Sequence, residues 1–416
     1  MPPGGLGVTG RLALAPAASK EDLVRRFRIL PGRVSPSRPP RILRRTLAAL
    51  AATLLAVALA PAAAVASPRH HHDRTADAGT AADVLMADYD PDPGWWPSRW
   101  WNSAVALHTI EDYELRTGDT RYRWVIDNTF QLNKGPFPAG ERSSDPIDGD
   151  FISRAIDDTE WWALAWIRAY DLTGDATYLN EAVTIANYVD GFWDTSTCGG
   201  GVWWDRERTY KNAVTNGLYI RLTAELHNHI PGDTAWLDKA TTAWHWYLDS
   251  GLINSAGLVN DGLTDDCQNN GQTVWSYNQG LGIGAGVAIW RATGDAQALD
   301  TARTLADAGT SDPALVTDGV LTESCDAIDA SCDDNQKQFK GVFMRYLTDL
   351  ADVTGDAAYR DFAAHQADTI WAQDRTDDNR LGERWNGASS AEHPNVFDWR
   401  TQASALSALL APLPAP

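Results

Sequence analysis

The stretch from Ala165 to Leu179, AWIRAYDLTGDATYL, decides the fold of this chain. Its first half is apolar at helical spacing, which predicts a helix that runs into Gly174. A glycine can take the left-handed conformation that closes a helix, and the aspartate after it can cap the next helix by accepting backbone N–H groups. The stretch therefore predicts the tip of a helical hairpin.

The Thr-Gly-Asp tripeptide of this tip recurs along the chain. Its copies begin at Thr117, Thr173, Thr293 and Thr354, and Pro231-Gly232-Asp233 fills the gap in the series. Successive glycines are 56, 58, 62 and 61 residues apart. Such a regular period indicates a repeat architecture in which each copy is one helical hairpin of about 60 residues.

A sixth apolar helix, over 401–410, follows without a Gly-Asp and begins a truncated last copy. Helices that are apolar nearly all round, such as 281–290, must be buried on several sides. Six buried helices that alternate with outer amphipathic ones predict an all-α fold, a closed (α/α)6 barrel, or toroid, of six helical hairpin repeats. Strand-like alternation is scarce, which disfavours α/β folds.

The first 66 residues predict a targeting segment. A basic region ends in Arg44-Arg45, an uncharged run extends over 46–60, and Ala64-Val65-Ala66 offers a small-residue cleavage site. The alternative is an uncleaved membrane anchor, but Pro61 and the alanine-rich tail fit a spanning helix poorly. We therefore predict a signal segment over 1–66, a polar linker over 67–82, a catalytic domain over 83–411, a tail over 412–416, and secretion.

Composition limits the possible partners. The chain has 35 Lys and Arg against 55 Asp and Glu, and removal of ten basic and two acidic residues with 1–66 leaves a net charge of −28. Such an acidic protein repels nucleic acid and anionic lipid, so we expect neither nucleic acid nor, after signal cleavage, a membrane as partner. We expect a monomer. Four cysteines in an exported chain predict two disulfides, for which three connectivities are possible. The short loop favours Cys325–Cys332, which leaves Cys198–Cys267; metal binding is the alternative, but no C-x-x-C or H-x-x-x-H spacing supports it.

Polar and aromatic clusters recur just before or at the start of each predicted inner helix. In a toroid of parallel inner helices these starts meet at one end, where aromatic rings beside amide and acid groups would suit a sugar. A hydrophobic plug is the alternative, Asp261 also fits a turn, and Trp161, Trp162 and Trp166 have core spacing. The predicted substrate-binding residues are Trp101, Asn102, Trp203, Trp204, Lys211, Asn212, Asp261, Tyr277, Asn278, Gln279, Gln338 and Phe339.

The adjacent acids Asp157 and Asp158 open one inner helix, and three interpretations compete. Asp157 with Glu160 fits a capping box before an apolar helix. D-D-x-E is also similar to the magnesium–diphosphate motif of terpene cyclases, but Gln268 stands where their second motif requires an acid. The third interpretation is a glycosidase pair, since two carboxyls about 5–5.5 Å apart can serve as nucleophile and acid/base. The helix dipole would favour an ionised nucleophile, and nearby tryptophans would raise the pKa of its partner.

The segment DDTEWWALAWIRAYDLTGDATYL, residues 157–179, resembles glycoside hydrolase family 76, the endo-α-1,6-mannanases. The resemblance covers roughly residues 83–411. It continues, in order, in TCGGGVWWDR (197–206), YKNAVTN (210–216), GLVNDGLTDDC (257–267), WSYNQG (275–280) and DNQKQFKG (334–341).

This resemblance implies an (α/α)6 barrel and retaining hydrolysis of α-1,6-linked mannan, with an α-mannan polysaccharide or oligosaccharide as partner. It implies Asp157 as nucleophile, Asp158 as general acid/base and Asp261 as a cleft residue, with no metal and no cofactor. Two alternatives stay open: a wall-remodelling transglycosidase of the same fold, and a non-catalytic mannan-binding protein, which would not need both aspartates.

Overall fold

The computed structural model describes residues 73–97 and 100–415, so the predicted signal segment and residues 67–72 of the predicted linker lie outside the described residues. Six inner helices are α2 Trp100–Thr117, α4 Ile156–Thr173, α6 Ala213–His229, α8 Ser276–Thr293, α10 Phe339–Thr354 and α12 Trp399–Leu410. Six outer helices are α1 Arg74–Ala87, α3 Trp124–Asn133, α5 Ala176–Asp190, α7 Ala235–Asp249, α9 Ala296–Ser311 and α11 Ala357–Thr369. Minor elements are the 3-10 turn η1 Gln336–Gln338, the π-helical turn η2 Ile370–Asp374, and the antiparallel pair β1 Val316–Thr317 and β2 Val320–Leu321.

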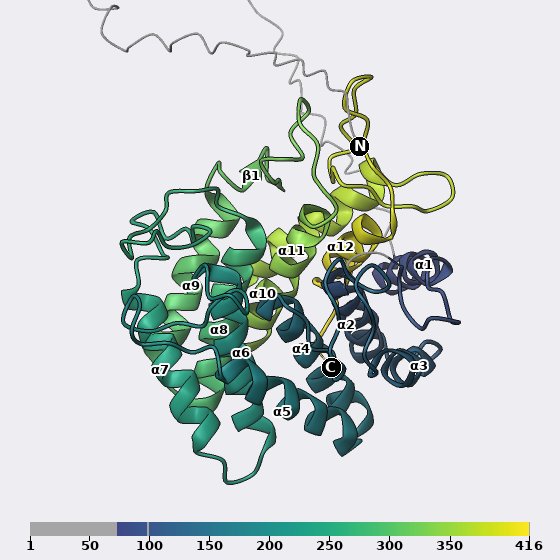
Figure 1. Ribbon diagram of the computed structural model, residues 1–416. Helices are drawn as coiled ribbons and strands as arrows, with labels where there is room; N and C mark the ends of the chain where they lie inside the picture. The colour runs from purple at the N-terminus through teal and green to yellow at the C-terminus, as the bar shows by residue number, and fades with distance from the viewer. Residues whose placement is uncertain (1–72, 98–99, 416) are drawn as a thin grey trace, which may run out of the picture. The chain divides into compact units, whose positions relative to one another are not determined.

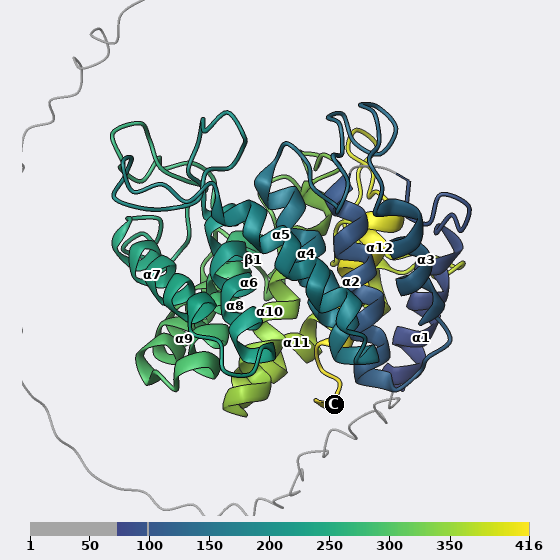
Figure 2. The ribbon, with the colours of Figure 1, turned by 60° about the horizontal axis from the view of Figure 1, so that its bottom comes forward.

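The inner helices form a closed ring. Each packs on the next in chain order, and α12 packs back on α2 (Figure 1). Each of α4, α6, α8 and α10 also packs on the outer helix that follows it, and long loops gather at one end of the helices (Figure 2). The predicted (α/α)6 toroid is confirmed.

Two inner-helix glycines explain how closely the ring packs. A Cβ at Gly280 of α8 would lie 2.6 Å from the Cα of Phe343 on α10, and one at Gly341 of α10 would lie 2.6 Å from the Cα of Ser404 on α12. Real Cβ atoms do not approach a backbone atom so closely, so these contacts require residues without a side chain.

The Thr-Gly-Asp tips behave as predicted where a short hairpin follows. Gly174, with a φ of 68°, ends α4 in the left-handed conformation, and Asp175 caps α5 by accepting the Thr177 N–H at 2.8 Å. The same arrangement joins α8 to α9 and α10 to α11. The predicted cap is wrong for Asp119, because α3 begins only at Trp124. Asp233 does cap the next helix, since its Oδ2 accepts the Trp236 N–H at 3.1 Å and the Leu237 N–H at 3.3 Å in the first turn of α7.

The predicted linker over 67–82 is wrong in its second half, because residues 74–82 form the first turns of α1. This helix packs on α12 and thereby supplies the outer helix of the sixth hairpin, which the sequence indicated as truncated. Ala78, Ala81 and Ala82 are fully buried, and the Ala81 carbonyl accepts a hydrogen bond from Gln402 of α12 at 3.0 Å. Small residues bury little apolar surface each, so the segment carries a weak hydrophobic signal among its polar neighbours.

Both predicted disulfides are present. Cys198–Cys267 joins the loop before α6 to the loop before α8, and Cys325–Cys332 closes the short loop before α10. All three loops lead into the starts of inner helices. The disulfides therefore fix the segments that surround the N-terminal end of the ring.

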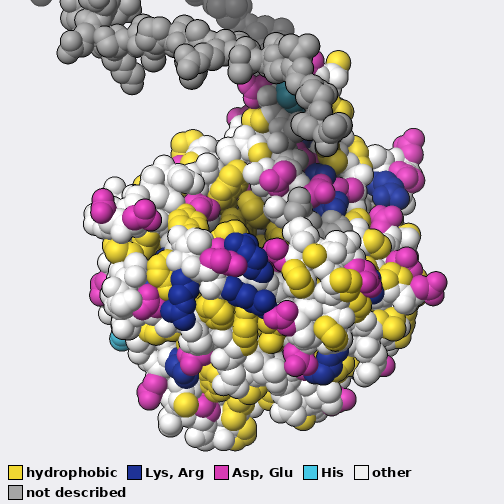
Figure 3. Space-filling model, in the orientation of Figure 1, with side chains coloured by type: hydrophobic (Ala, Val, Ile, Leu, Met, Phe, Trp, Pro, Cys, Tyr) yellow, Lys and Arg dark blue, Asp and Glu magenta, His cyan; other side chains and the backbone are white. Residues whose placement is uncertain are grey.

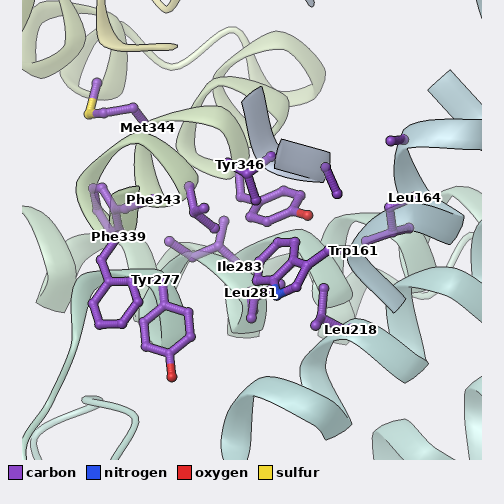
Figure 4. Packing of buried hydrophobic residues seen from close by; sticks show 14 of the residues in the cluster. Trp161, Leu164, Leu218, Tyr277, Leu281, Ile283, Phe339, Phe343, Met344 and Tyr346 are labelled. Atoms are coloured by element: carbon purple, nitrogen blue, oxygen red, sulfur yellow. The ribbon is translucent and has the colours of Figure 1, made fainter. Parts of the chain in front are cut away.

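The predicted core tryptophans are confirmed as core residues. Trp162 and Trp166 are fully buried and Trp161 is 3% exposed. Figure 4 shows Trp161 among buried side chains from other inner helices, which include Leu218 of α6 and Tyr346 of α10. Within the described ranges, no helix combines the length and the apolar character that crossing a bilayer requires.

Candidate active site

A cavity of about 600 Å³ lies where the inner helices begin. Five inner helices contribute residues from their first two turns, and the loop before α4 forms one side. The cavity is lined by Trp100, Trp101, Gly140, Glu141, Arg142, Ser143, Ser144, Asp145, Arg154, Ala155, Asp157, Asp158, Trp161, Trp204, Val214, Tyr277, Asn335 and Phe339. The expected convergence of distant helix starts is therefore observed.

Asp157 and Asp158 occupy the first turn of α4, and both line this cavity. The capping-box interpretation is wrong, because the N-cap is Ala155 and it makes no side-chain cap. Asp157 lies two residues after this N-cap, too late to cap the helix, and its Oδ1 instead accepts the Asp158 backbone N–H at 3.0 Å. The N-terminal end of a helix favours negative charge, so this position stabilises a carboxylate.

Trp204 orients the first of these acids. The Ile156 N–H donates to the Trp204 carbonyl at 2.8 Å, beside a bridge between Ala155 and Asp205, so the loop after Cys198 pairs with the start of α4. This pairing places the Trp204 indole N–H 3.1 Å from Oδ2 of Asp157. Both carboxylate oxygens of Asp157 therefore accept an N–H donor.

Burial raises the pKa of Asp157 to about 7. The hydrogen bonds from the Asp158 N–H and the Trp204 indole act in the opposite direction, because they favour the ionised carboxylate, while the charge of Asp261 raises the pKa further. A carboxyl group with a pKa near neutrality can change its protonation state under mild conditions. Such perturbed acids in a cavity are typical of active sites.

Asp261 lies behind the cavity wall. Its Oδ2 accepts the hydroxyl of Tyr210 at 2.7 Å, and its carbonyl accepts the Ala213 N–H at 2.8 Å. Burial raises the pKa of Asp261, and Tyr210 lowers it. Asp261 therefore acts on Asp157 through its charge, although it does not line the cavity.

Aromatic rings form part of the cavity wall. The Tyr277 and Phe339 rings stack at 3.9 Å, and Figure 4 shows the Tyr277 hydroxyl pointing away from the hydrophobic cluster. Trp101 stacks on Trp161 at 5.7 Å, and its indole N–H donates to Asn335 at 3.0 Å. These rings are fixed in place before any ligand arrives, which suits a preformed binding platform.

The structure brings the predicted residues Asp157, Asp158, Trp101, Trp204, Tyr277 and Phe339 together in the cavity. It does not bring the other predicted residues there. The Lys211 ammonium donates to three backbone carbonyls, Asn212 caps α6, and the Trp203 indole donates to Asp194. These three side chains hold the loop between α5 and α6 in shape.

The remaining predicted amides are also packed away from the cavity. Asn102 and Gln338 bond to each other, and Gln279 bonds to Val259, Gly257 and Leu305. Asn278 is fully buried in α8. Sequence spacing placed these residues at helix starts correctly but could not tell which way each side chain points.

The loop 140–145 and Arg154 line the cavity, although the sequence motifs did not indicate them, and so does Trp100, which precedes the predicted Trp101. Arg142 stacks on the Phe137 ring and donates to Asn133 at 2.8 Å, while Arg154 pairs with Asp205 at 3.0 Å and Glu207 at 2.9 Å. The loop belongs to none of the repeat motifs. The signal that the sequence offered for a place near the site was that the loop leads towards Asp157.

The charge around the cavity is mixed. Figure 3 shows basic side chains gathered near the centre of one face, with acidic and hydrophobic side chains around them.

Among the described residues, no group of three or more His, Cys, Asp or Glu is placed to hold a metal ion.

The fold and the site together define an (α/α)6 protein with a pair of acids in an aromatic-walled cavity. Residues 74–415 match the profile of glycosyl hydrolase family 76. The chain belongs to this family.

Two curated relatives have related sequences. A putative mannan endo-1,6-α-mannosidase of Schizosaccharomyces pombe is 27% identical over 282 residues, which cover 64% of this chain and 62% of the relative. A mannan endo-1,6-α-mannosidase of Candida albicans is 24% identical over 339 residues, covering 76% and 72%. The chain therefore spans about three fifths of the length of the first relative.

Two solved structures have the same fold. The GH76A α-1,6-mannanase from Salegentibacter sp. HEL1_6 matches with a TM-score of 0.68 at 25% identity, over 82% of this chain and 99% of that chain. The Lin0763 protein from Listeria innocua matches with a TM-score of 0.68 at 26% identity, over 82% and 96%.

Proposed function

We propose that this chain is an exported glycoside hydrolase that cleaves α-1,6-mannosidic bonds in mannan with retention of configuration. The observation that carries the proposal is the pair Asp157 and Asp158 in one cavity, with Asp157 held by the Trp204 indole. A non-catalytic binding protein would need the aromatic wall but not an oriented pair of acids.

Asp157 is the proposed nucleophile. Its two N–H donors and the start of α4 stabilise the carboxylate and fix its direction, so an oxygen of Asp157 can attack the anomeric carbon. Asp158 donates a proton to the departing glycosidic oxygen, and the sugar becomes covalently bound to Asp157.

The second step returns the protein to its starting state. Asp158, now ionised, takes a proton from a water molecule, and the resulting hydroxide attacks the anomeric carbon and releases Asp157. Two inversions give net retention. The aromatic wall of Trp101, Tyr277 and Phe339 is proposed to stack on the sugar rings beside the scissile bond.

The substrate class rests on the relatives. The curated relatives carry the name mannan endo-1,6-α-mannosidase. An inactive variant of the Salegentibacter α-1,6-mannanase, with two adjacent aspartates replaced, was solved in complex with α-1,6-mannotetraose. An adjacent aspartate pair in the same fold supports the same chemistry here.

Export is part of the proposal. The two disulfides close within one chain that has no free cysteine among its described residues, which suits an oxidising compartment. The basic, apolar and small-residue zones of residues 1–66 supply a signal for that route. N-terminal sequencing of the protein recovered from culture medium tests export, and recovery only with cells would contradict it.

The central experiment follows the products of linear α-1,6-mannan by NMR and mass spectrometry. We expect shorter oligosaccharides whose new reducing ends first appear as the α-anomer, before mutarotation. Products longer than the substrate would indicate transglycosylation instead. First-formed β-anomer would contradict retention, and no reaction at all would contradict the hydrolase assignment.

A further inference from the structure

A second cavity, of about 630 Å³, lies at the other end of the inner helices. The first cavity is lined by the first two turns of five inner helices, whereas this one is lined by later turns of these helices and of α12. On α4, Arg168 of the second cavity follows Asp157 of the first by eleven residues, a rise of about 16 Å. The second cavity is therefore separate from the proposed catalytic site.

Charged side chains dominate the lining of this far-end cavity. None of its described lining residues is Trp, Tyr or Phe, so it offers no aromatic face on which a sugar could stack. Its charged lining residues are Arg116, Arg168, Arg221, Arg291 and Arg345 and the acids Asp112, Asp171, Glu225, Asp349 and Asp352. Such a lining suits a small charged ligand.

One carboxylate in this cavity serves two guanidinium groups. Asp112 accepts Arg345 Nε at 2.8 Å on one oxygen and lies 3.0 Å from Arg168 Nε on the other. Arg168 also pairs with Asp171 at 3.1 Å, so two carboxylates compensate the two guanidinium groups that meet at Asp112. Near it, Arg221 pairs with Asp349 at 2.6 Å and with Glu225 at 3.2 Å.

Two buried donors near Asp112 have no partner in the described part of the chain. Arg345 is 5% exposed, and its Nη2 donates to Thr109 Oγ1 at 2.9 Å, but its Nη1 has no hydrogen bond. His108 is 4% exposed, and its Nε2 has no hydrogen bond and lies 3.9 Å from Asp112. A buried unpaired donor is costly, so such an arrangement is expected to be completed by a ligand.

The surroundings of His108 agree with an anion rather than a cation. Burial lowers the pKa of His108 well below its usual value, and the charges of Arg345, Arg168 and Arg221 lower it further. The imidazole is therefore neutral at pH 7 and can donate its Nε2 proton. The three guanidinium groups disfavour a further positive charge on this imidazole.

We propose that the far-end cavity binds a small oxyanion of the carboxylate or phosphate class, which accepts hydrogen bonds from Nη1 of Arg345 and Nε2 of His108. A guanidinium group suits both kinds of anion because its planar N–H donors match their oxygens. The proposal does not depend on the reaction at the other end of the ring.

Isothermal titration of the purified protein with inorganic phosphate and with acetate, at constant ionic strength set with sodium chloride, tests this proposal. We expect saturable binding of at least one of the two anions, and Arg345→Lys to weaken it at least tenfold because lysine lacks the forked donors. Binding of phosphate alone or acetate alone assigns the anion class. No saturable binding of either anion overturns the proposal.

Two control variants, each also an arginine-to-lysine change, test whether the anion binds at Arg345. Arg154→Lys changes an arginine of the first cavity, and Arg116→Lys changes one in the far-end cavity that is already engaged by Asp352 and the Leu413 carbonyl. Both should bind the anion as the unmodified protein does. Binding that is lost in Arg154→Lys and kept in Arg345→Lys overturns the proposal.

If Arg345→Lys fails to fold by circular dichroism, His108→Leu provides the test. It removes the Nε2 donor without touching an ion pair at hydrogen-bonding distance, and it should weaken binding severalfold. Unchanged affinity in a folded His108→Leu protein overturns the proposal.

Discussion

The two ends of the helical ring carry cavities of nearly the same size, about 600 and 630 Å³, with opposite chemistry. At the end where the inner helices begin, Asp157 accepts only N–H donors of a backbone and an indole, beside an aromatic wall. At the other end, acids such as Asp349 pair with arginines, and none of the described residues that line the space is Trp, Tyr or Phe.

The difference follows from the direction of the helices. Helix starts favour carboxylates without a cationic partner, so an acid there can stay reactive. Helix ends carry partial negative charge, so buried acids there need arginines to remain ionised. One set of parallel helices thus provides a reactive end and a charge-compensated end.

The largest expected effect is a loss of kcat when an acid at the reactive end is replaced. Asp157→Asn removes the proposed nucleophile and should lower kcat on α-1,6-mannan by at least about 1000-fold, because residual catalysis would rest on binding alone. Initial rates on linear mannan measure this. Asp352→Asn, at the far end, is the control and should stay within about twofold of the unmodified rate; a similar loss in both variants would mean that the two ends are not functionally distinct.

The next largest expected effect is a loss of stability when an arginine at the charge-compensated end is replaced. Arg221→Gln leaves Asp349 and Glu225 without their closest cation and should lower the free energy of unfolding by about 3–5 kcal/mol. Urea unfolding measures the change. Arg291→Gln is the control, since Arg291 is 35% exposed and lies 3.9 Å from Glu225, and it should cost less than about 1 kcal/mol. Equal costs would show that burial at this end does not matter.

A smaller loss of activity is expected when Asp157 stays in place but loses the hydrogen bond that orients it. Trp204→Phe removes the indole N–H and should lower kcat by roughly 10- to 100-fold. Because this hydrogen bond lowers the pKa of Asp157, its loss should move the acidic limb of the pH profile of kcat/KM above about 7. Trp203→Phe, whose indole donates to Asp194, is the control; an unshifted limb in Trp204→Phe would argue against the contact.

The smallest effect is an opposite dependence of stability on pH at the two ends. Burial raises the pKa of Asp157 to about 7 and that of Glu323, which bonds to Ser276 at the start of α8, to about 8. The folded state therefore binds extra protons above pH 4, so the stability that these groups contribute is lost as the pH rises towards 8.

At the far end the sign is reversed. Burial alone would raise the pKa of Asp349, but Arg221, Arg291 and Arg168 outweigh it and lower the pKa, so its contribution is present at neutral pH and is lost only in strong acid. Thermal unfolding between pH 5 and 8 should show a falling Tm that Glu323→Gln flattens. A Tm that rises over this range, with no change in Glu323→Gln, would contradict the assignment.

Much of the fold could be predicted because its signals are local. Gly174 and Asp175 act on the turn in which they stand, and the 60-residue period repeats that turn, so the hairpins and their number followed from the sequence. Asp119 failed as a cap because the chain continues through extra residues before α3, which a tripeptide cannot reveal.

The site was only partly predictable because side-chain direction depends on partners far away in sequence. Tyr277 and Gln279 share one helix start, yet one faces the cavity and the other bonds to Leu305. The far-end cavity was missed for the same reason. Arg168, Arg221 and Arg345 look like ordinary polar positions on separate helices, and only closure of the ring brings them together.

The pairing of α1 with α12 has a consequence for how the molecule assembles. Gln402 of α12 bonds to Ala81 of α1 across 321 positions of sequence, so the hairpin that completes the ring joins the earliest and the latest helices of the described chain. Contacts of such separation carry a high loop-closure cost and form late. A growing polypeptide would hold an open arc of helices with exposed apolar flanks until α12 emerges, which makes this seam the step at which misfolding and aggregation compete with maturation.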